Sequence, residues 1–170
     1  MKIGVTGHRY DRVGGEKLPN PQYNKICYEF ERVFLEHKPN LSSVLTGMAV
    51  GSDQFAAHVA LRNNIPVSAI LPFKNQDALW SIPDKNRYQR LLDRCFDVVI
   101  IHDSYIPSSY QERNKYIVNN CDILVAVFDG VNSGGTFNTI KYAYSQNFSL
   151  NPSKKERQLI IISPDVVDRE

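Results

Sequence analysis

Short apolar segments alternate with amphipathic segments along most of this chain. Apolar runs bounded by glycine or polar residues are typical of buried strands, whereas apolar residues spaced three and four apart indicate helices. The expected strands are residues 2–7, 43–46, 66–71, 97–101, 123–128 and 159–162, and the expected helices are residues 21–37, 52–63, 84–95, 109–120 and 136–146. This alternation predicts an α/β, Rossmann-like fold, with an open, mainly parallel sheet covered by helices on both faces.

Three glycine-containing turns follow expected strands. They are VTGHR at 5–9, TGMAVGSD at 46–53 and FDGVNSGGT at 128–136. Ligands of such sheets bind beyond the carboxyl ends of the strands. Glycine lets backbone N–H groups approach an anion there, and a helix that follows adds the positive end of its dipole. We therefore expect the three turns to share one edge of the sheet and to bind a ligand that carries phosphate.

The composition indicates one globular domain spanning residues 1–170, with 42% apolar and 22% charged residues. A net charge of +2 excludes the broad basic surface that holds duplex DNA. The three cysteines are far apart, fit neither a disulfide framework nor a zinc site, and favour a reducing compartment. No apolar run is long enough to cross a bilayer, and the first residues already read as a strand, so we expect a cytoplasmic protein.

Each turn carries residues suited to a ligand, and each has a simpler interpretation. Arg9 offers a planar fork for phosphate beside His8, or both are solvated turn residues. Asp53 accepts a ribose hydroxyl, or it only pairs with the dipole of its helix. Asp129 accepts a hydroxyl, or it caps the turn. The candidate ligand-binding residues in the turns are Gly7, His8, Arg9, Gly47, Met48, Gly51, Asp53, Asp129, Gly134, Gly135 and Thr136.

Three further candidates lie outside the turns. The spacing of helix 109–120 places Arg113 and Asn114 on the face expected to be buried. Buried polar groups need partners, so these two either bond the neighbouring loop or line a pocket. Trp80, the only tryptophan, lies in a polar loop, where it stacks on a base or covers the edge of the core. His8 has no second ligand at a recognisable spacing, and we predict neither a metal nor a cofactor.

The motifs together resemble the SLOG superfamily, the Rossmann-like proteins that group the DNA-processing protein Smf/DprA with the cytokinin-activating LOG enzymes. The match is best with a small stand-alone bacterial and phage group that has a GHR turn. The segments that carry the resemblance are VTGHR, TGMAVGSDQFAAHVAL (46–61), PFKNQDALW (72–80), ERNKYIVNNCDILVAVFDG (112–130) and GGTFNTIKYA (134–143). They occur in the family's order and span almost the whole chain.

This resemblance implies a nucleotide or nucleotide-derived ligand and a homodimer, whereas the net charge of +2 predicts weak or absent DNA binding. LOG enzymes cleave the N-glycosidic bond of nucleoside monophosphates and carry the signature PGG-x-GT-x-x-E. Here Gly135 and Thr136 match the GT, but Thr139 stands at the glutamate position. Asp53, Glu112 or Asp129 would have to supply an acid instead. We expect a nucleotide-sensing or nucleotide-binding module. The alternatives are an N-glycoside hydrolase acting on a nucleotide and, third, a single-strand DNA binder.

Overall fold

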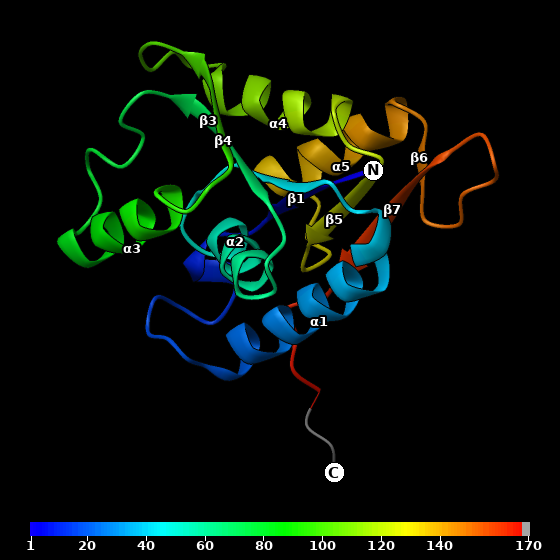
Figure 1. The fold of residues 1–170 in the computed structure, drawn as a ribbon, viewed down its shortest axis with the longest axis horizontal. Coiled ribbons are helices and arrows are strands. Elements are labelled where there is room, and N and C mark those ends of the chain that lie inside the picture. The colour runs from blue at the N-terminus through cyan, green and yellow to red at the C-terminus, as the bar shows by residue number, and fades with distance from the viewer. Residues whose placement is uncertain (168–170) are drawn as a thin grey trace.

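The computed structural model describes residues 1–167 of the chain (Figure 1). The strands are β1 (Lys2–Gly7), β2 (Ser43–Thr46), β3 (Val67–Phe73), β4 (Asp97–His102), β5 (Ile123–Val127), β6 (Phe148–Ser149) and β7 (Arg157–Ile162). The α-helices are α1 (Pro21–His37), α2 (Ser52–Arg62), α3 (Ile82–Leu92), α4 (Ser109–Asn119) and α5 (Gly135–Ser145), and two short 3-10 helices are η1 (Tyr10–Arg12) and η2 (Lys38–Asn40).

The strands form one sheet in the order β4-β3-β2-β1-β5-β7-β6, and every neighbouring pair in the described residues is parallel. Helices α1, α2 and α3 cover one face, and α4 and α5 cover the other (Figure 1). Alternate residues of one strand supply the two cores: Val125 packs in the core under α1 and α2, and Leu124 in the core under α4 and α5. The predicted Rossmann-like α/β fold is confirmed.

The order of the strands decides where the three glycine turns meet. They follow β1, β2 and β5, which are adjacent in the middle of the sheet. Strands β1 and β5 run in register to their ends, with Gly7 opposite Val127. Strand β2 lies on one side of β1 and β5 on the other, so the connections that leave these strands diverge at this point of the sheet. A crevice forms beyond the carboxyl ends of strands where the connections diverge in this way. The expectation that the turns share one edge is confirmed.

Several element bounds shift by one to three residues from the sequence prediction, and two differences have a clear local cause. Helix α3 begins two residues early, at Ile82, because the Ser81 hydroxyl accepts the N–H of Asp84 and Pro83 suits the first turn of a helix. Strand β6 was not predicted because two residues carry no readable alternation. Within residues 1–167, the helices are too short or too polar to cross a membrane.

Candidate functional site

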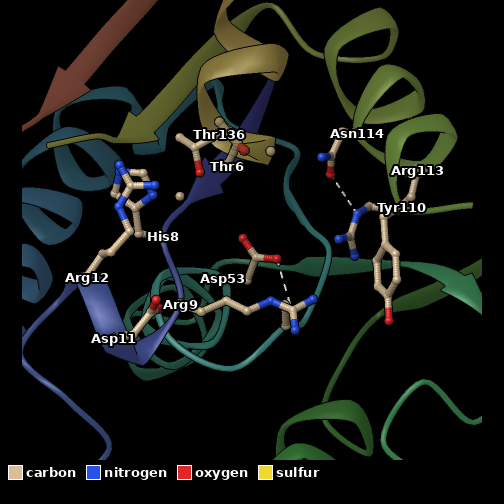
Figure 2. Close-up of a pocket in the computed structure, with 13 residues that line it drawn as sticks. Thr6, His8, Arg9, Asp11, Arg12, Asp53, Tyr110, Arg113, Asn114 and Thr136 are labelled. Carbon is tan, nitrogen blue, oxygen red and sulfur yellow. Dashed lines mark hydrogen bonds between the residues drawn. The ribbon is translucent and has the colours of Figure 1, made fainter. Parts of the chain in front are cut away.

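A cavity of about 320 Å³ opens beyond the carboxyl ends of the central strands. We call it the main cavity. Figure 2 shows side chains from β1, η1, α2, α4 and α5 arranged around this one space. The lining residues are Thr6, Gly7, His8, Arg9, Asp11, Arg12, Ala49, Asp53, Tyr110, Arg113, Asn114, Gly135 and Thr136. Segments far apart in the sequence thus meet around a mainly polar space of ligand size.

The turn after β1 is fixed against the start of α2. The carbonyl of His8 accepts hydrogen bonds from the Ser52 N–H at 3.1 Å and the Ser52 hydroxyl at 2.7 Å. Gly51, just before α2, has a φ of +93°, and a Cβ there would lie 2.8 Å from the Arg9 Cα and the His8 carbonyl oxygen. Only glycine combines this conformation with so close an approach. Arg9 therefore leaves a rigid turn at the mouth of the cavity.

The turn after β2 brings a carboxyl group into the cavity wall. The Asp53 carboxylate accepts the N–H of Ala49 at 3.3 Å, and the Asp53 carbonyl accepts the Thr46 hydroxyl at 2.9 Å. Only 8% of Asp53 is exposed. Burial raises the pKa of Asp53, while Arg113, the Ala49 N–H and Arg9 act in the opposite direction. Asp53 is thus a buried carboxyl group beside cations and is available to a ligand hydroxyl.

Helix α4 contributes a buried guanidinium. Arg113, only 4% exposed, donates from Nη1 to the Gly47 carbonyl at 2.8 Å and from Nε to the Asn114 side-chain oxygen at 2.8 Å. A Cβ on Gly47 would lie 2.2 Å from Arg113 Nη1, so glycine makes room for the guanidinium. Burial lowers the pKa of Arg113, and Asp53 opposes this. Both sequence interpretations apply together: Arg113 bonds the neighbouring loop and also lines the cavity.

Helix α5 points its N-terminus at the cavity through Gly135 and Thr136. The helix is preceded by Gly134, which provides no side-chain cap. The first helical acceptor, the Gly134 carbonyl, receives the N–H of Asn138. Within residues 1–167, the N–H groups of Gly135, Thr136 and Phe137 have no acceptor. Free N–H groups and the helix dipole together favour an anion at this position.

Arg12 and Asp129 form a bidentate ion pair beside the cavity. Arg12 Nε donates to Asp129 Oδ2 at 2.7 Å, and Nη2 donates to Oδ1 at 2.6 Å. This pairing holds the pKa of Asp129 well below its usual range. Burial lowers the pKa of His8, so its ring is neutral at neutral pH and Nε2 accepts the Asp129 N–H at 3.2 Å. We therefore infer that the ion-pair partner of the Asp129 carboxylate is Arg12, and that His8 next to it is uncharged.

The main cavity gathers most but not all of the residues expected from the sequence. Those that line it are Gly7, His8, Arg9, Asp53, Arg113, Asn114, Gly135 and Thr136. Four others are outside the lining, and three of them contact residues that line it: Gly47 beside Arg113, Gly51 beside Arg9, and Gly134 beside Arg12, while Met48 is buried in the core. Asp129 is not in the lining, because both carboxylate oxygens are held by Arg12. Trp80 lies elsewhere, packed edge-on against Tyr88 with ring centroids 5.2 Å apart, and covers the core.

The sequence interpretation missed Thr6, Asp11, Arg12, Ala49 and Tyr110, which also line the cavity. Tyr110 had a signal, since it shares the inward helix face with Arg113. Its ring lies 5.5 Å from the Arg9 guanidinium carbon and 5.9 Å from that of Arg113. Arg12 had none, because only the folded chain brings η1 beside the end of β5.

The Arg12–Asp129 pair predicts a pH-dependent stability difference. The pKa of the Asp129 carboxyl group is lower in the folded protein than in the unfolded chain, where it is about 3.9. The ionised carboxylate therefore contributes fully to the free energy of unfolding above about pH 3.9, and this contribution is lost as the pH falls toward the folded-state pKa. Asp129→Asn should therefore lower the free energy of unfolding at pH 7, and the difference from wild type should shrink below about pH 4. Urea unfolding between pH 7 and pH 3 measures this. Arg12→Gln should show the same trend, and a difference independent of pH would contradict the assignment.

Comparison with known sequences gives one consistent family. The family model described as "YspA SLOG family" matches residues 3–165. An uncharacterised SPbeta prophage-derived protein, YoqJ of Bacillus subtilis strain 168, is 31% identical over 145 residues, covering 74% of this chain and 84% of that protein. The UPF0398 protein YpsA of the same strain is 24% identical over 173 residues, covering 93% and 87%.

Solved structures show the same fold at low identity. DNA processing protein A from Streptococcus pneumoniae aligns with a TM-score of 0.64 and 17% identity over 98% of this chain, which spans only 52% of that protein. The molybdenum cofactor binding protein from Rippkaea orientalis aligns with a TM-score of 0.58 and 20% identity, covering 96% of this chain and 77% of that one. At these identities the likeness concerns the fold.

Proposed function

Because the chain belongs to the YspA SLOG family, we propose that it is a binding or sensing module for a nucleotide or nucleotide-derived ligand, held in the main cavity. The observation that carries this proposal is the uncapped N-terminus of α5, whose free N–H groups face a cavity lined by arginines. Preorganised N–H donors and cations at one place are the chemistry that recognises phosphate.

In this proposal the phosphate lies on the N–H groups of Gly135 and Thr136. Arg9 lines the same cavity and is available to the phosphate, since no carboxylate lies within 4 Å of its guanidinium in the described part of the chain. Arg12 is already neutralised by Asp129 and serves to shape the wall. Arginine forks match phosphate oxygens in geometry as well as charge.

The opposite wall suits the rest of a nucleotide. Asp53 accepts a sugar hydroxyl, and Asn114 offers amide hydrogen bonds to sugar or base. An adjoining cavity of about 280 Å³ also contains Tyr110, Asn114 and Gly135 and extends between α4 and α5. The two spaces together have the volume of a typical small-molecule site, roughly 300–1,000 Å³.

A panel of nucleotides tests the proposal. The protein is titrated calorimetrically with nucleoside mono- and diphosphates and with the matching nucleosides, and each mixture is then separated by HPLC. We expect at least one phosphorylated member to bind and to be recovered intact, while its nucleoside binds far more weakly. Equal affinities for a nucleotide and its nucleoside would remove the phosphate site.

One observation favours a second candidate function, N-glycoside hydrolysis of the bound nucleotide. Asp53 is a buried carboxyl group with a raised pKa inside the cavity, a pattern found at catalytic acids. Thr139, at the position of the LOG glutamate, donates its hydroxyl to the Gly135 carbonyl at 2.8 Å and has no acid to offer. Release of free base in the HPLC assay, abolished by Asp53→Asn, would establish hydrolysis instead of simple binding.

We expect only weak, non-specific binding to single-stranded DNA. The solved structure of DNA processing protein A from Helicobacter pylori concerns its binding to single-stranded DNA. The net charge of the present chain is only +2, so few positive side chains are left to contact DNA phosphates. Six or more phosphate contacts would make affinity fall by about 10³-fold or more between 50 and 200 mM salt. A gel-shift assay at about 150 mM salt checks this, and submicromolar binding there would favour a DNA function.

We also propose that the protein is a homodimer, since closed twofold pairs are the commonest assembly. Strand β4 is an edge of the sheet, Val98 and Ile100 are exposed on it, and Phe96 is exposed immediately before it. Proteins normally protect an exposed edge strand that carries apolar side chains from pairing with another chain. Light scattering on the 19.4 kDa chain tests the assembly, and a monomer at tens of micromolar, roughly enough for a stable interface, would contradict it.

A further inference from the structure

Helices α1, α2 and α3 cover one face of the sheet (Figure 1). A second and larger cavity is lined by residues of these three helices and of the segment before α1. We call it the α3 cavity. Its volume is about 620 Å³, and it shares no lining residue with the main cavity. The lining residues are Leu18, Pro19, Tyr23, Gln54, Phe55, His58, Arg87, Arg90, Leu91 and Arg94. Neither the sequence motifs nor the proposed nucleotide site accounts for it.

One wall of the α3 cavity is apolar and partly aromatic. Tyr23 packs edge-to-face on Phe55 with ring centroids 4.8 Å apart. Leu18, Pro19 and Leu91 extend this surface. Such a wall favours a flat apolar group, because aromatic side chains bury large areas and have defined packing geometries.

The other wall is cationic. Arg87, Arg90 and Arg94 follow one another at spacings of three and four, so they lie along one face of α3 and its C-terminal extension. Arg87 is neutralised by Asp84, with Nη1 3.2 Å from Oδ1. Arg90 and Arg94 have no carboxylate within 4 Å anywhere in residues 1–167. Two uncompensated guanidinium groups therefore stand beside an apolar surface.

The base of the cavity carries polar groups without a negative charge. Burial lowers the pKa of His58, and Arg62 and Arg94 lower it further, so the ring does not add a cation at neutral pH. Gln54 is 2% exposed, and its side-chain nitrogen donates to the Met48 carbonyl at 3.1 Å. Its side-chain oxygen has no donor among the described residues. Among the described residues that line the cavity, the charge thus comes from Arg87, Arg90 and Arg94.

We propose that the α3 cavity binds a small organic anion with a flat apolar body, namely an aryl phosphate or carboxylate. The body packs against Tyr23 and Phe55, and the anionic group accepts hydrogen bonds from Arg90 and Arg94. The volume is within the usual range for small-molecule sites, roughly 300–1,000 Å³, and charge-assisted bonds from two arginines supply the specificity. The site is separate from the nucleotide site and does not depend on it.

Phenyl phosphate is the probe, and Gly135→Asp is the background, because that substitution blocks the proposed phosphate position in the main cavity. Calorimetric titration should show one phenyl phosphate bound per chain. Adding Arg90→Gln and Arg94→Gln should weaken binding by about tenfold or more, since two charge-assisted hydrogen bonds are lost. Lys85→Gln, which removes a charge from the same helix outside the cavity, should leave it unchanged.

Inorganic phosphate has the anionic group of the probe without the ring, and benzyl alcohol has the ring without the anionic group. Each should bind more weakly than phenyl phosphate. Thermal melts of all variants check that the fold is intact. The proposal is overturned if phenyl phosphate does not bind, if the double substitution leaves its affinity unchanged, or if inorganic phosphate binds equally well. None of these results depends on whether a nucleotide binds in the main cavity.

Discussion

Replacing Gly135 with Asp is expected to abolish nucleotide binding while the protein stays folded. A Cβ at Gly135 meets no atom within 4 Å, so the new side chain has room. An acidic residue in the first turn also suits the dipole of α5, so the melting temperature should not fall. The carboxylate, however, occupies the place proposed for the phosphate. Like charges in contact cost several kcal/mol, which is a loss of affinity of about 100-fold or more.

The matched control is Gly135→Asn, which has nearly the same size and no charge. It should weaken binding by less than about tenfold, because steric loss alone remains. Calorimetry on both variants, with the nucleotide that the panel selects, gives the comparison. Wild-type affinity in Gly135→Asp would remove the N-terminus of α5 from the site.

The largest effect on stability is expected from Gly47→Ala. Replacing glycine with alanine, where the backbone conformation permits it, usually stabilises a protein by ~0.4–1 kcal/mol, because the unfolded chain has less conformational entropy to lose. Here the added Cβ would lie within 2.8 Å of three atoms of the Arg113 guanidinium, which is buried and bonded to the Gly47 carbonyl. Overpacking of this kind costs ~1–3 kcal/mol, so the sign should reverse and the free energy of unfolding should fall. Displacement of Arg113 should also weaken ligand binding.

A double-mutant cycle isolates this contact. In an Arg113→Ala background the clash is gone, and Gly47→Ala should no longer lower the free energy of unfolding. Urea unfolding of the four proteins measures both steps. A cost of the same size in both backgrounds would show that Arg113 is not what requires glycine at residue 47.

The strands and the edge at which they converge were predictable because the signals are local. Buried parallel strands are nearly continuous apolar runs, and glycine turns stand where the chain leaves them. Helical spacing also placed Arg113 on the inward face of α4, where a polar residue had to find a partner. The structure supplies that partner, the Gly47 carbonyl, from a turn 66 residues earlier.

The remaining part of the site depends on pairings that the sequence does not encode locally. Asp129 was expected either to accept a ligand hydroxyl or to cap its turn. In the structure its Oδ1 accepts the Val131 N–H at 3.0 Å, and Arg12, 117 residues away, donates to both carboxylate oxygens. Trp80 had equal claims to stacking on a base and to covering the core, and in the structure its ring packs against Tyr88 at the edge of the core. In both cases the side chain makes contacts in the folded chain that its local sequence pattern does not specify.

The central claim is that a phosphorylated ligand sits on the N-terminus of α5 in the main cavity. The most direct measurement is a titration of ¹⁵N-labelled protein with the nucleotide panel and the matching nucleosides, followed through the backbone amide signals. Saturable shifts centred on Gly135, Thr136 and Phe137, produced by phosphorylated members and not by their nucleosides, are the predicted result. No shift with any member, or shifts centred elsewhere, such as on α3, would contradict the claim.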